Sequence, residues 1–162
     1  MEKYIQFYRK AAGDDGTGEA SMALGLCYLK LRLYDMAAAQ FKKTIETAPE
    51  RAEAHLYTAC ALAKGRKLKT VPSKEMPDIE AFVGAALMLA PDEPRALALQ
   101  AAIKNDYYAA NGMRVPPPQP SELLGRLRST GAKRQHVDEV LDLTPLSDTG
   151  FAQSLRSAAV AV

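Results

Sequence analysis

The stretch that decides the fold of this 162-residue chain runs from residue 18 to residue 51 and reads GEASMALGLCYLKLRLYDMAAAQFKKTIETAPER. Its apolar residues recur at helical spacing in two segments, 19–33 and 34–48. Pro49 ends the second segment, because proline lacks the N–H that a helix needs and disfavours helix in the residue before it. The stretch therefore predicts two consecutive helices joined by a short turn.

Helical spacing continues on both sides of this stretch, and no segment shows the alternation typical of a strand. Further helices are expected at residues 2–12, 51–63, 78–90, 94–110, 122–128 and 135–143, with a weak one after residue 147. The 28 alanines and the absence of tryptophan favour helices that pack closely through small side chains. The sequence therefore predicts an all-α protein.

Two of the expected helices end in the same way, with an alanine followed by a proline. The two prolines are Pro49 and Pro91, which lie 42 residues apart. A period of this length is typical of solenoids that are built from helical hairpins. The spacing therefore favours a helical-repeat architecture.

Residues 18–51 resemble the tetratricopeptide repeat, a helical hairpin whose pattern spans 34 residues. The residues at the expected offsets of this pattern are Leu24, Gly25, Tyr28, Tyr34, Ala37, Phe41 and Pro49. The small residues Gly25 and Ala37 let the two helices approach closely, and the larger ones fill the space around them. Two positions depart from the pattern, since Ser21 replaces the usual tryptophan and Thr44 the usual alanine.

The rest of the chain matches this family more weakly. The second repeat is stretched from 34 to 42 residues by about eight residues within 64–77, and the third has only its first helix, 94–110. Residues 2–12 resemble the second helix of a truncated leading repeat, with a junction similar to that of the related Sel-one-like repeats. The resemblance implies a right-handed α-solenoid of antiparallel helix hairpins over residues 2–112.

The composition changes after the expected repeats. Residues 113–120 are rich in proline and predict a linker. Residues 121–162 are expected to form a C-terminal helical cap or tail, which folds back near 123–143 and frays over about its last ten residues. Ser121 is the expected N-cap of the first helix in this region. The pattern Arg-x-x-Pro-x-x-Pro from Arg114 also fits ligands of SH3-type grooves, but a rigid spacer is the favoured interpretation.

The family resemblance implies a non-enzymatic protein–protein interaction module, an adaptor or scaffold, whose concave groove accepts a peptide or helix of another protein. The first helix of each hairpin would line this groove. Carried over position by position, the groove residues are Glu19, Met22, Leu26, Leu29, Lys30, Glu53, Leu56, Cys60, Lys64, Arg95 and Ala98, with Ala102, Asn105 and Asp106 as further candidates. Charged substitutions at Met22 and Leu26 are the test that this assignment suggests.

Some members of the family hold the two carboxylates of a chaperone C-terminus in a clamp of lysines and asparagines. The matching positions in this chain are Met22, Leu26, Tyr57 and Arg95, of which only the last is basic. We therefore expect no binding of acidic C-terminal tails of that kind.

The net charge is only +2, but two segments are strongly basic. Residues 64–77 and 114–136 each carry a net charge of +4 and hold the candidate basic patch, Arg66, Lys67, Lys69, Arg126, Arg128, Lys133 and Arg134. The favoured interpretation is solvated loops that pair with neighbouring acidic helices. The alternative is a charge-driven binder of an acidic partner or nucleic acid. Nucleic acid is disfavoured, because no aromatic residues are interleaved with the basic ones.

No arrangement of residues typical of an enzyme, a metal site or a cofactor site stands out. Cys27 and Cys60 lack ligand partners at metal-binding spacing and are interpreted as small buried hydrophobic residues. His55 stands where the repeat usually has tryptophan and is expected to pack. The glycine-rich segment 13–18 lacks the features of a phosphate or calcium loop and is interpreted as a turn. An enzyme of unrecognised type is the least favoured alternative.

Targeting and membrane signals are not evident either. The N-terminal residues contain no apolar run typical of a signal peptide. The longest uncharged apolar run, 81–90, is shorter than the roughly 20 residues that a membrane-spanning helix needs. Together with two thiols that have no evident partner, these features predict a cytoplasmic protein without membrane association.

Overall fold

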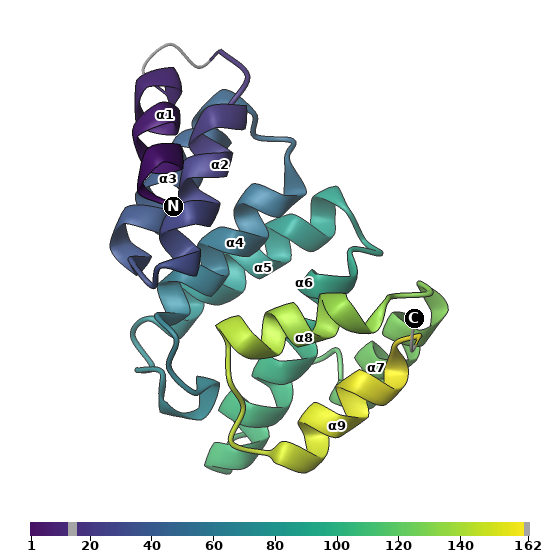
Figure 1. Cartoon of the computed structure of the whole chain (residues 1–162). Coiled ribbons are helices and arrows are strands. Elements are labelled where there is room, and N and C mark those ends of the chain that lie inside the picture. Colours follow the sequence, from purple (N-terminus) through teal and green to yellow (C-terminus); the bar gives the residue numbers. More distant parts are fainter. Residues whose placement is uncertain (13–15, 161–162) are drawn as a thin grey trace.

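The computed structural model describes residues 1–12 and 16–160, and the regular structure in this part of the chain is helical (Figure 1). The α-helices are α1 (Glu2–Ala12), α2 (Glu19–Lys30), α3 (Tyr34–Thr47), α4 (Ala52–Ala63), α5 (Met76–Leu89), α6 (Pro94–Ala102), α7 (Pro120–Ser129), α8 (Arg134–Leu143) and α9 (Thr149–Ala158). Three short elements complete them: the 3-10 turns η1 (Leu68–Thr70) and η3 (Ala109–Asn111), and the π-helical turn η2 (Ile103–Tyr108). The all-α prediction is confirmed for the described residues.

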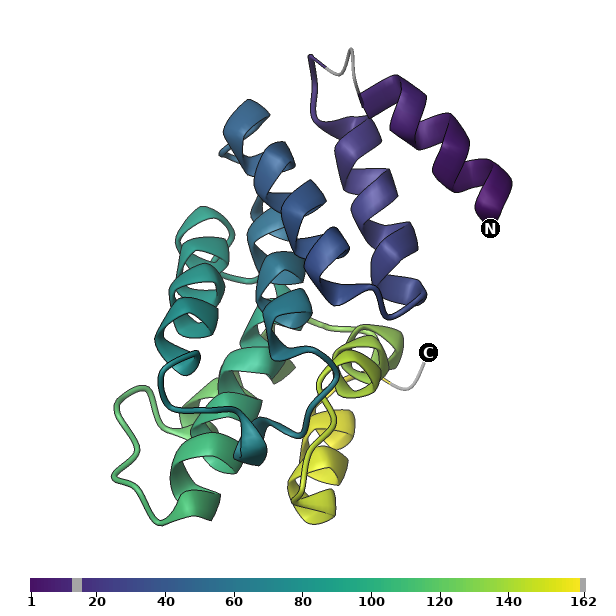
Figure 2. The ribbon, with the colours of Figure 1, turned by 90° about the vertical axis from the view of Figure 1, so that its left-hand side faces the viewer.

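Each helix from α1 to α6 packs on the next one along the chain, as the side view shows (Figure 2). The C-terminal helices α7, α8 and α9 all pack on α6. Helix α8 also contacts α4, so it lies against two helices that are separated from it by long stretches of sequence (Figure 1). This position of α8 determines which parts of the expected groove remain open.

Gly25 allows α2 and α3 to approach closely, as the sequence predicts. A β-carbon at this position would lie 2.5 Å from Cε1 of Phe41, whose side chain is fully buried. Ala37, the other small residue of the pattern, is also fully buried. The predicted contact through small side chains is therefore confirmed at this pair of helices.

The two departures from the repeat pattern lie next to each other in space. The Ser21 and Thr44 hydroxyls are both fully buried, and their oxygens lie 2.8 Å apart. Each hydroxyl has one proton, so one hydroxyl donates to its partner, and the partner donates to a backbone carbonyl. That carbonyl is Gly18, 3.1 Å from the Ser21 oxygen, or Gln40, 3.1 Å from the Thr44 oxygen. A buried hydroxyl without a partner costs free energy, so the two polar substitutions stabilise each other.

The helix ends that the sequence marks by proline have nearly the same geometry. Ala48 follows α3 with φ −135° and ψ 73°, and Ala90 follows α5 with φ −140° and ψ 86°. In each turn the alanine N–H donates to a carbonyl four residues earlier, at 2.7 Å to Thr44 and 2.8 Å to Ala86. Helix α8 ends in a similar way at Thr144, again before a proline. The sequence period therefore corresponds to a repeated local structure.

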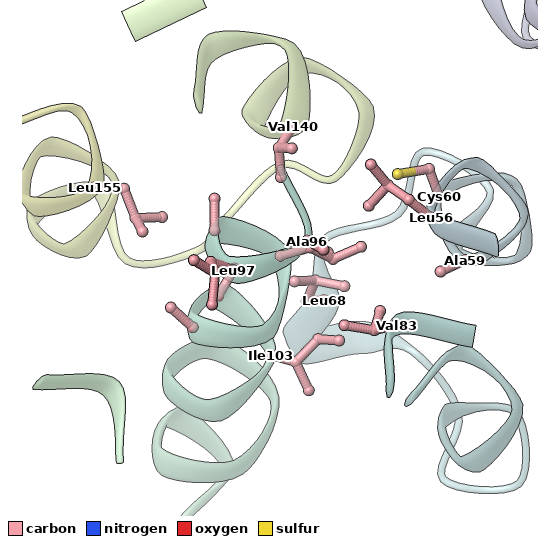
Figure 3. Close-up of a cluster of buried hydrophobic side chains, with 14 of the residues drawn as sticks. Leu56, Ala59, Cys60, Leu68, Val83, Ala96, Leu97, Ile103, Val140 and Leu155 are labelled. Carbon is pink, nitrogen blue, oxygen red and sulfur yellow. The ribbon is translucent and has the colours of Figure 1, made fainter. Parts of the chain in front are cut away.

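Two clusters of buried side chains form the core. The smaller one joins α2, α3 and α4 and includes Leu24, Phe41 and Ala54, with α1 packed against its edge. The larger one extends from α4 to α9 and includes Leu97 and Val140 (Figure 3). Because α4 contributes side chains to both clusters, the core continues from one end of the molecule to the other.

The segment 94–110 was expected to form one helix, and it is helical throughout, but it is not one regular α-helix. Helix α6 ends at Ala102, and the chain continues through the wider turn η2. This turn carries the fully buried Asp106, whose carboxylate accepts hydrogen bonds from the backbone N–H groups of Lys69 at 3.0 Å, Ser147 at 3.0 Å and Asp148 at 3.2 Å. One side chain thus ties η2 to the loop after α4 and to the connection between α8 and α9.

Helix α7 begins at Pro120, one residue before the expected N-cap Ser121. Gln119 is the N-cap instead, and its N–H donates to the Glu122 carboxylate at 3.0 Å. Proline is tolerated at the first helical position, because the N–H that it lacks would have no helical partner there. The turn expected over residues 13–18 includes 13–15, which lie outside the described residues.

The C-terminal residues were expected to fray, but α9 packs on α6, α7 and α8. Leu155 on this helix is fully buried. Beyond α9, the Val160 N–H donates to the Ala132 carbonyl at 2.7 Å, and the Arg134 N–H donates to the Val160 carbonyl at 3.0 Å. The segment therefore has both a buried anchor and backbone hydrogen bonds as far as Val160.

Candidate functional site

An open pocket of about 450 Å³ lies between α2, α4 and α8. Its lining residues are Leu26, Leu29, Lys30, Tyr57, Glu139, Asp142 and Leu143. The first three come from α2, the helix that the family resemblance assigns to the groove of the strongest repeat. The others come from α4 and from the C-terminal helix α8, which forms the opposite wall.

The pocket combines an apolar floor with charged groups at its edge. Leu26 is 38% exposed, whereas Leu29 is buried and Leu143 half-buried. Lys30 and Asp142 are exposed on different walls, and neither forms an ion pair with another described residue. The pocket thus presents apolar surface together with one free positive and one free negative group.

The third charged group of the lining, Glu139, is fully engaged. Its Oε1 accepts a hydrogen bond of 2.6 Å from the Tyr57 hydroxyl, and its Oε2 accepts one of 2.6 Å from Nε of Arg95. Arg95 in turn pairs with Glu93 at 3.1 Å. These bonds join α8 to α4 and α6. Burial raises the pKa of Tyr57, and the hydrogen bond to Glu139 raises it further, so this hydroxyl remains a donor.

Cys60 lies on α4, close to this network, and is fully buried. Burial raises the pKa of its thiol to about 12, and the nearby Glu139 carboxylate contributes in the same direction. A thiol with such a pKa is protonated at neutral pH and is a poor nucleophile. The position therefore has the properties of a packing residue.

The structure places the predicted groove residues in four different environments. Leu26, Leu29 and Lys30 line the pocket, and Arg95 belongs to the Glu139 network. Glu19 and Glu53 are exposed but do not line the pocket, and Lys64 pairs with Asp35 at 3.6 Å. The buried members of the set are Met22, Leu56, Cys60 and Ala98, joined by the further candidates Ala102 and Asp106.

Leu56, Cys60 and Ala98 do not face solvent, because α8 packs on α4 and α6 and belongs to the same core cluster. Met22 is buried in the other cluster, among α2, α3 and α4. Val137, Val140 and Leu141 form the apolar face of α8 and belong to the same core cluster as Leu56 and Ala98. The open part of the expected groove is therefore its N-terminal end, beside α2.

The sequence predicted that the segment near 123–143 folds back, but it did not predict that α8 forms a wall of the pocket. Glu139, Asp142 and Leu143 were assigned only to a short helix of the cap, and Tyr57 was considered only as a counterpart of a clamp residue. The available signal was the apolar spacing in 135–143, which predicts that one face of this helix is buried. That signal does not identify the helices against which the face packs.

The candidate basic residues do not form one surface. Arg66 makes two hydrogen bonds of 3.1 Å to the Glu75 carboxylate and also donates to the Leu62 and Ala63 carbonyls. Arg126 donates to the Pro91 carbonyl, and the exposed Arg134 lies 3.9 Å from Asp138. The exposed side chains for which the structure gives no such partner are Lys67, Lys69, Arg128 and Lys133. Figure 1 shows the loop after α4 and helix α7 on different sides of α6.

His55, the cysteines and the acidic side chains of the described residues form no other candidate site. His55 Nε2–H donates a hydrogen bond of 3.0 Å to the Pro49 carbonyl, and the ring lies beside that of Phe82, so this side chain has a packing role. Both cysteines are free, and no group of three or more His, Cys, Asp or Glu side chains is placed to hold a metal ion in 1–12 and 16–160. In the same residues, no helix is long and apolar enough to cross a membrane.

Comparison with known proteins adds no family to these observations. No family model matches the chain, and no curated protein matches it. The assignment of a function therefore depends on the pocket and on the packing of successive helices.

Proposed function

We propose that the chain is a tetratricopeptide-like protein, in which antiparallel helix hairpins form a right-handed solenoid. Three observations support this proposal. Successive helices pack on each other, Gly25 fits closely against Phe41, and the proline-marked helix ends recur with the same geometry after 42 residues. The two hairpins are α2 with α3 and α4 with α5.

The function that this architecture supports best is non-enzymatic binding of another protein. The observation that carries the proposal is the open apolar pocket of about 450 Å³ beside α2, because Leu26, Leu29 and Lys30 of the expected groove all line it. A groove that is open to solvent and has an apolar floor suits a peptide or helix with an apolar anchor. We assign the chain the role of an adaptor or scaffold.

The structure changes the experiment that tests this role. Met22 is only 2% exposed, so a charged residue there would unfold the hairpin instead of reporting on binding. Leu26→Glu is the suitable variant, since this side chain is exposed and lines the pocket. Leu89→Glu is the matched control, because Leu89 is 44% exposed on α5 and does not line the pocket.

The expected result is that affinity purification with Leu26→Glu loses partners that both the original chain and Leu89→Glu retain. Circular dichroism should show the same helix content for all three proteins. An unchanged set of partners with Leu26→Glu would contradict the groove as the binding site.

A charge-driven binder of an acidic partner is the alternative. It depends on exposed basic residues such as Lys67 and Lys69, since Arg66 is already bonded to Glu75. An affinity that falls steeply between low and physiological salt would favour this alternative over an apolar groove.

A further inference from the structure

The pocket beside α2 carries two charges of opposite sign that have no ion-pair partner among the described residues. Lys30 is the last residue of α2, and Asp142 lies near the end of α8, on the other wall. Both side chains are exposed. Leu26 on the α2 wall and Leu143 on the α8 wall supply apolar surface. The arrangement is asymmetric, so it distinguishes the two directions of a bound segment.

Glu139 is less available to a partner than Asp142, although it also lines the pocket. Both of its carboxylate oxygens accept 2.6 Å hydrogen bonds, one from Tyr57 and one from Arg95. A basic group of a partner would therefore meet Asp142, whose carboxylate is free, in preference to Glu139. An acidic group of a partner would meet Lys30, which has no ion-pair partner among the described residues.

We propose that the pocket binds a protein segment with one large apolar anchor residue, flanked by an acidic residue that faces Lys30 and a basic residue that faces Asp142. This inference rests on the proposed function and gives the chemistry of the partner. The two ion pairs set the direction of the segment, because a reversed segment would place like charges together. The apolar floor supplies the main part of the affinity.

A protein segment suits the pocket better than a small molecule. Sites for small molecules bury most of the ligand surface, which requires walls on nearly all sides. Here α2, α4 and α8 enclose the space, but it remains open to solvent. A segment of a larger partner covers such an opening with its own surface.

The test selects short random peptides displayed on phage against the full-length chain, and in parallel against the double variant Lys30→Glu with Asp142→Lys. Both substituted side chains are exposed, and circular dichroism and urea unfolding check that the fold is retained. The original chain should enrich peptides with an apolar anchor between an acidic and a basic residue. The double variant should enrich peptides with the two charges exchanged.

Selected peptides are then synthesised and measured by fluorescence anisotropy against both proteins and against Leu26→Glu. Each peptide should lose about tenfold in affinity for the protein of the opposite charge arrangement. Binding should be lost with Leu26→Glu.

The outcomes separate this inference from the proposed function. Peptides that need Leu26 but bind both charge arrangements equally would overturn the inference and leave the proposed function in place. Failure to enrich any peptide whose binding depends on Leu26 would contradict both. Competition by free leucine, a zwitterion with an apolar side chain, at concentrations that displace the peptides would identify a small-molecule site and overturn the inference.

Discussion

Gly25 is a residue at which the local and the tertiary preferences of the chain oppose each other. In a helix, alanine is more favourable than glycine by about 1 kcal/mol. In this fold, however, the added β-carbon would lie 2.5 Å from the buried ring of Phe41. Overpacking a core costs about 1–3 kcal/mol, which outweighs the gain in helix propensity, so Gly25→Ala should lower the free energy of unfolding by up to about 2 kcal/mol, measured by urea denaturation.

Gly84, inside α5, is the matched control for this prediction. A β-carbon there has no neighbouring atom within 4 Å, so Gly84→Ala should stabilise the protein by up to about 1 kcal/mol. If both variants shifted the midpoint in the same direction, the close approach of α2 and α3 would be in doubt.

The two thiols should differ strongly in reactivity. Cys60 is fully buried and its pKa is raised to about 12 by burial, whereas Cys27 is half-buried. A thiol-reactive dye at pH 8 should therefore label Cys27 in the native protein and reach Cys60 only in denaturant, because the thiolate is the reactive form. The variant Cys27→Ser should show almost no native labelling. Fast labelling of that variant would mean that α8 does not cover α4 as the structure has it.

The contact between Ser21 and Thr44 could not be predicted from the sequence pattern, whereas the close fit at Gly25 could. The sequence predicted the fit at Gly25, because the repeat pattern has a small residue at this offset, where the two helices of a hairpin approach closely. It presented Ser21 and Thr44 as two separate departures, since nothing in a linear pattern joins residues 23 positions apart. Their hydroxyls compensate each other only once α2 and α3 have packed.

At the scale of elements, Glu139 holds α8 on α4 and α6. Glu139→Ala would leave the Tyr57 hydroxyl without its hydrogen-bond acceptor and remove one of the two carboxylates that pair with Arg95. We expect a loss of about 1–3 kcal/mol in the free energy of unfolding, because a buried polar group would lose its partner. Asp142→Ala on the same helix removes an exposed side chain and should change it by less than about 0.5 kcal/mol. Equal effects of the two variants would show that the network does not anchor α8.

Asp106 holds two connections in place, the loop after α4 and the segment between α8 and α9. Asp106→Asn keeps the size of the side chain but replaces one acceptor oxygen with an NH₂ group, although three backbone N–H groups point at this carboxylate. Hydrogen bonds to charged groups contribute about 1.5–3 kcal/mol, so a loss of this size is expected. Hydrogen exchange should become faster at the amides of Lys69, Ser147 or Asp148. Unchanged exchange at all three would show that the carboxylate does not hold the loops.

The positions of the helices could largely be predicted from periodicity and from proline, while their connections could not. Helices α2 to α5 begin and end within about three residues of the expected places, because Pro49 and Pro91 mark their ends. The segment after Ala102 has helical spacing as well, yet it forms the wider turn η2. The partners of its buried Asp106 lie about 40 residues away in both directions, at Lys69 and Ser147.

One half of the candidate site could be predicted from the sequence and the other half could not. The half on α2 could be predicted, because Leu26, Leu29 and Lys30 follow from one repeat and its pattern. The half on α8 could not, since Asp142 and Leu143 reach the pocket only through the packing of α8 on α4 and α6. Local spacing determines which face of α8 is apolar, and tertiary packing determines where that face lies.

The molecule as a whole has a core that is larger at its C-terminal end. The cluster from α4 to α9 includes the fully buried side chains Leu123, Leu127 and Val137 from outside the expected repeats. In α1, by contrast, Ile5 and Tyr8 are only partly buried, and Tyr4 and Phe7 are 63% and 66% exposed. The two ends of the chain should therefore contribute unequally to stability.

This asymmetry predicts opposite results for two shortened chains. A chain that ends at Gly112 loses α7, α8 and α9 and exposes the side chains of α6 that they cover, Leu97 among them, so we expect it to aggregate or to lose cooperative unfolding. A chain that begins at Gly16 loses only the partly buried contacts of α1 and should remain monodisperse and helical, with a lower urea midpoint. Size-exclusion chromatography and circular dichroism distinguish these results. If the chain ending at Gly112 unfolded cooperatively with undiminished stability, α7 to α9 would be a separate attachment, and the wall that α8 gives the pocket would not be an integral part of the fold.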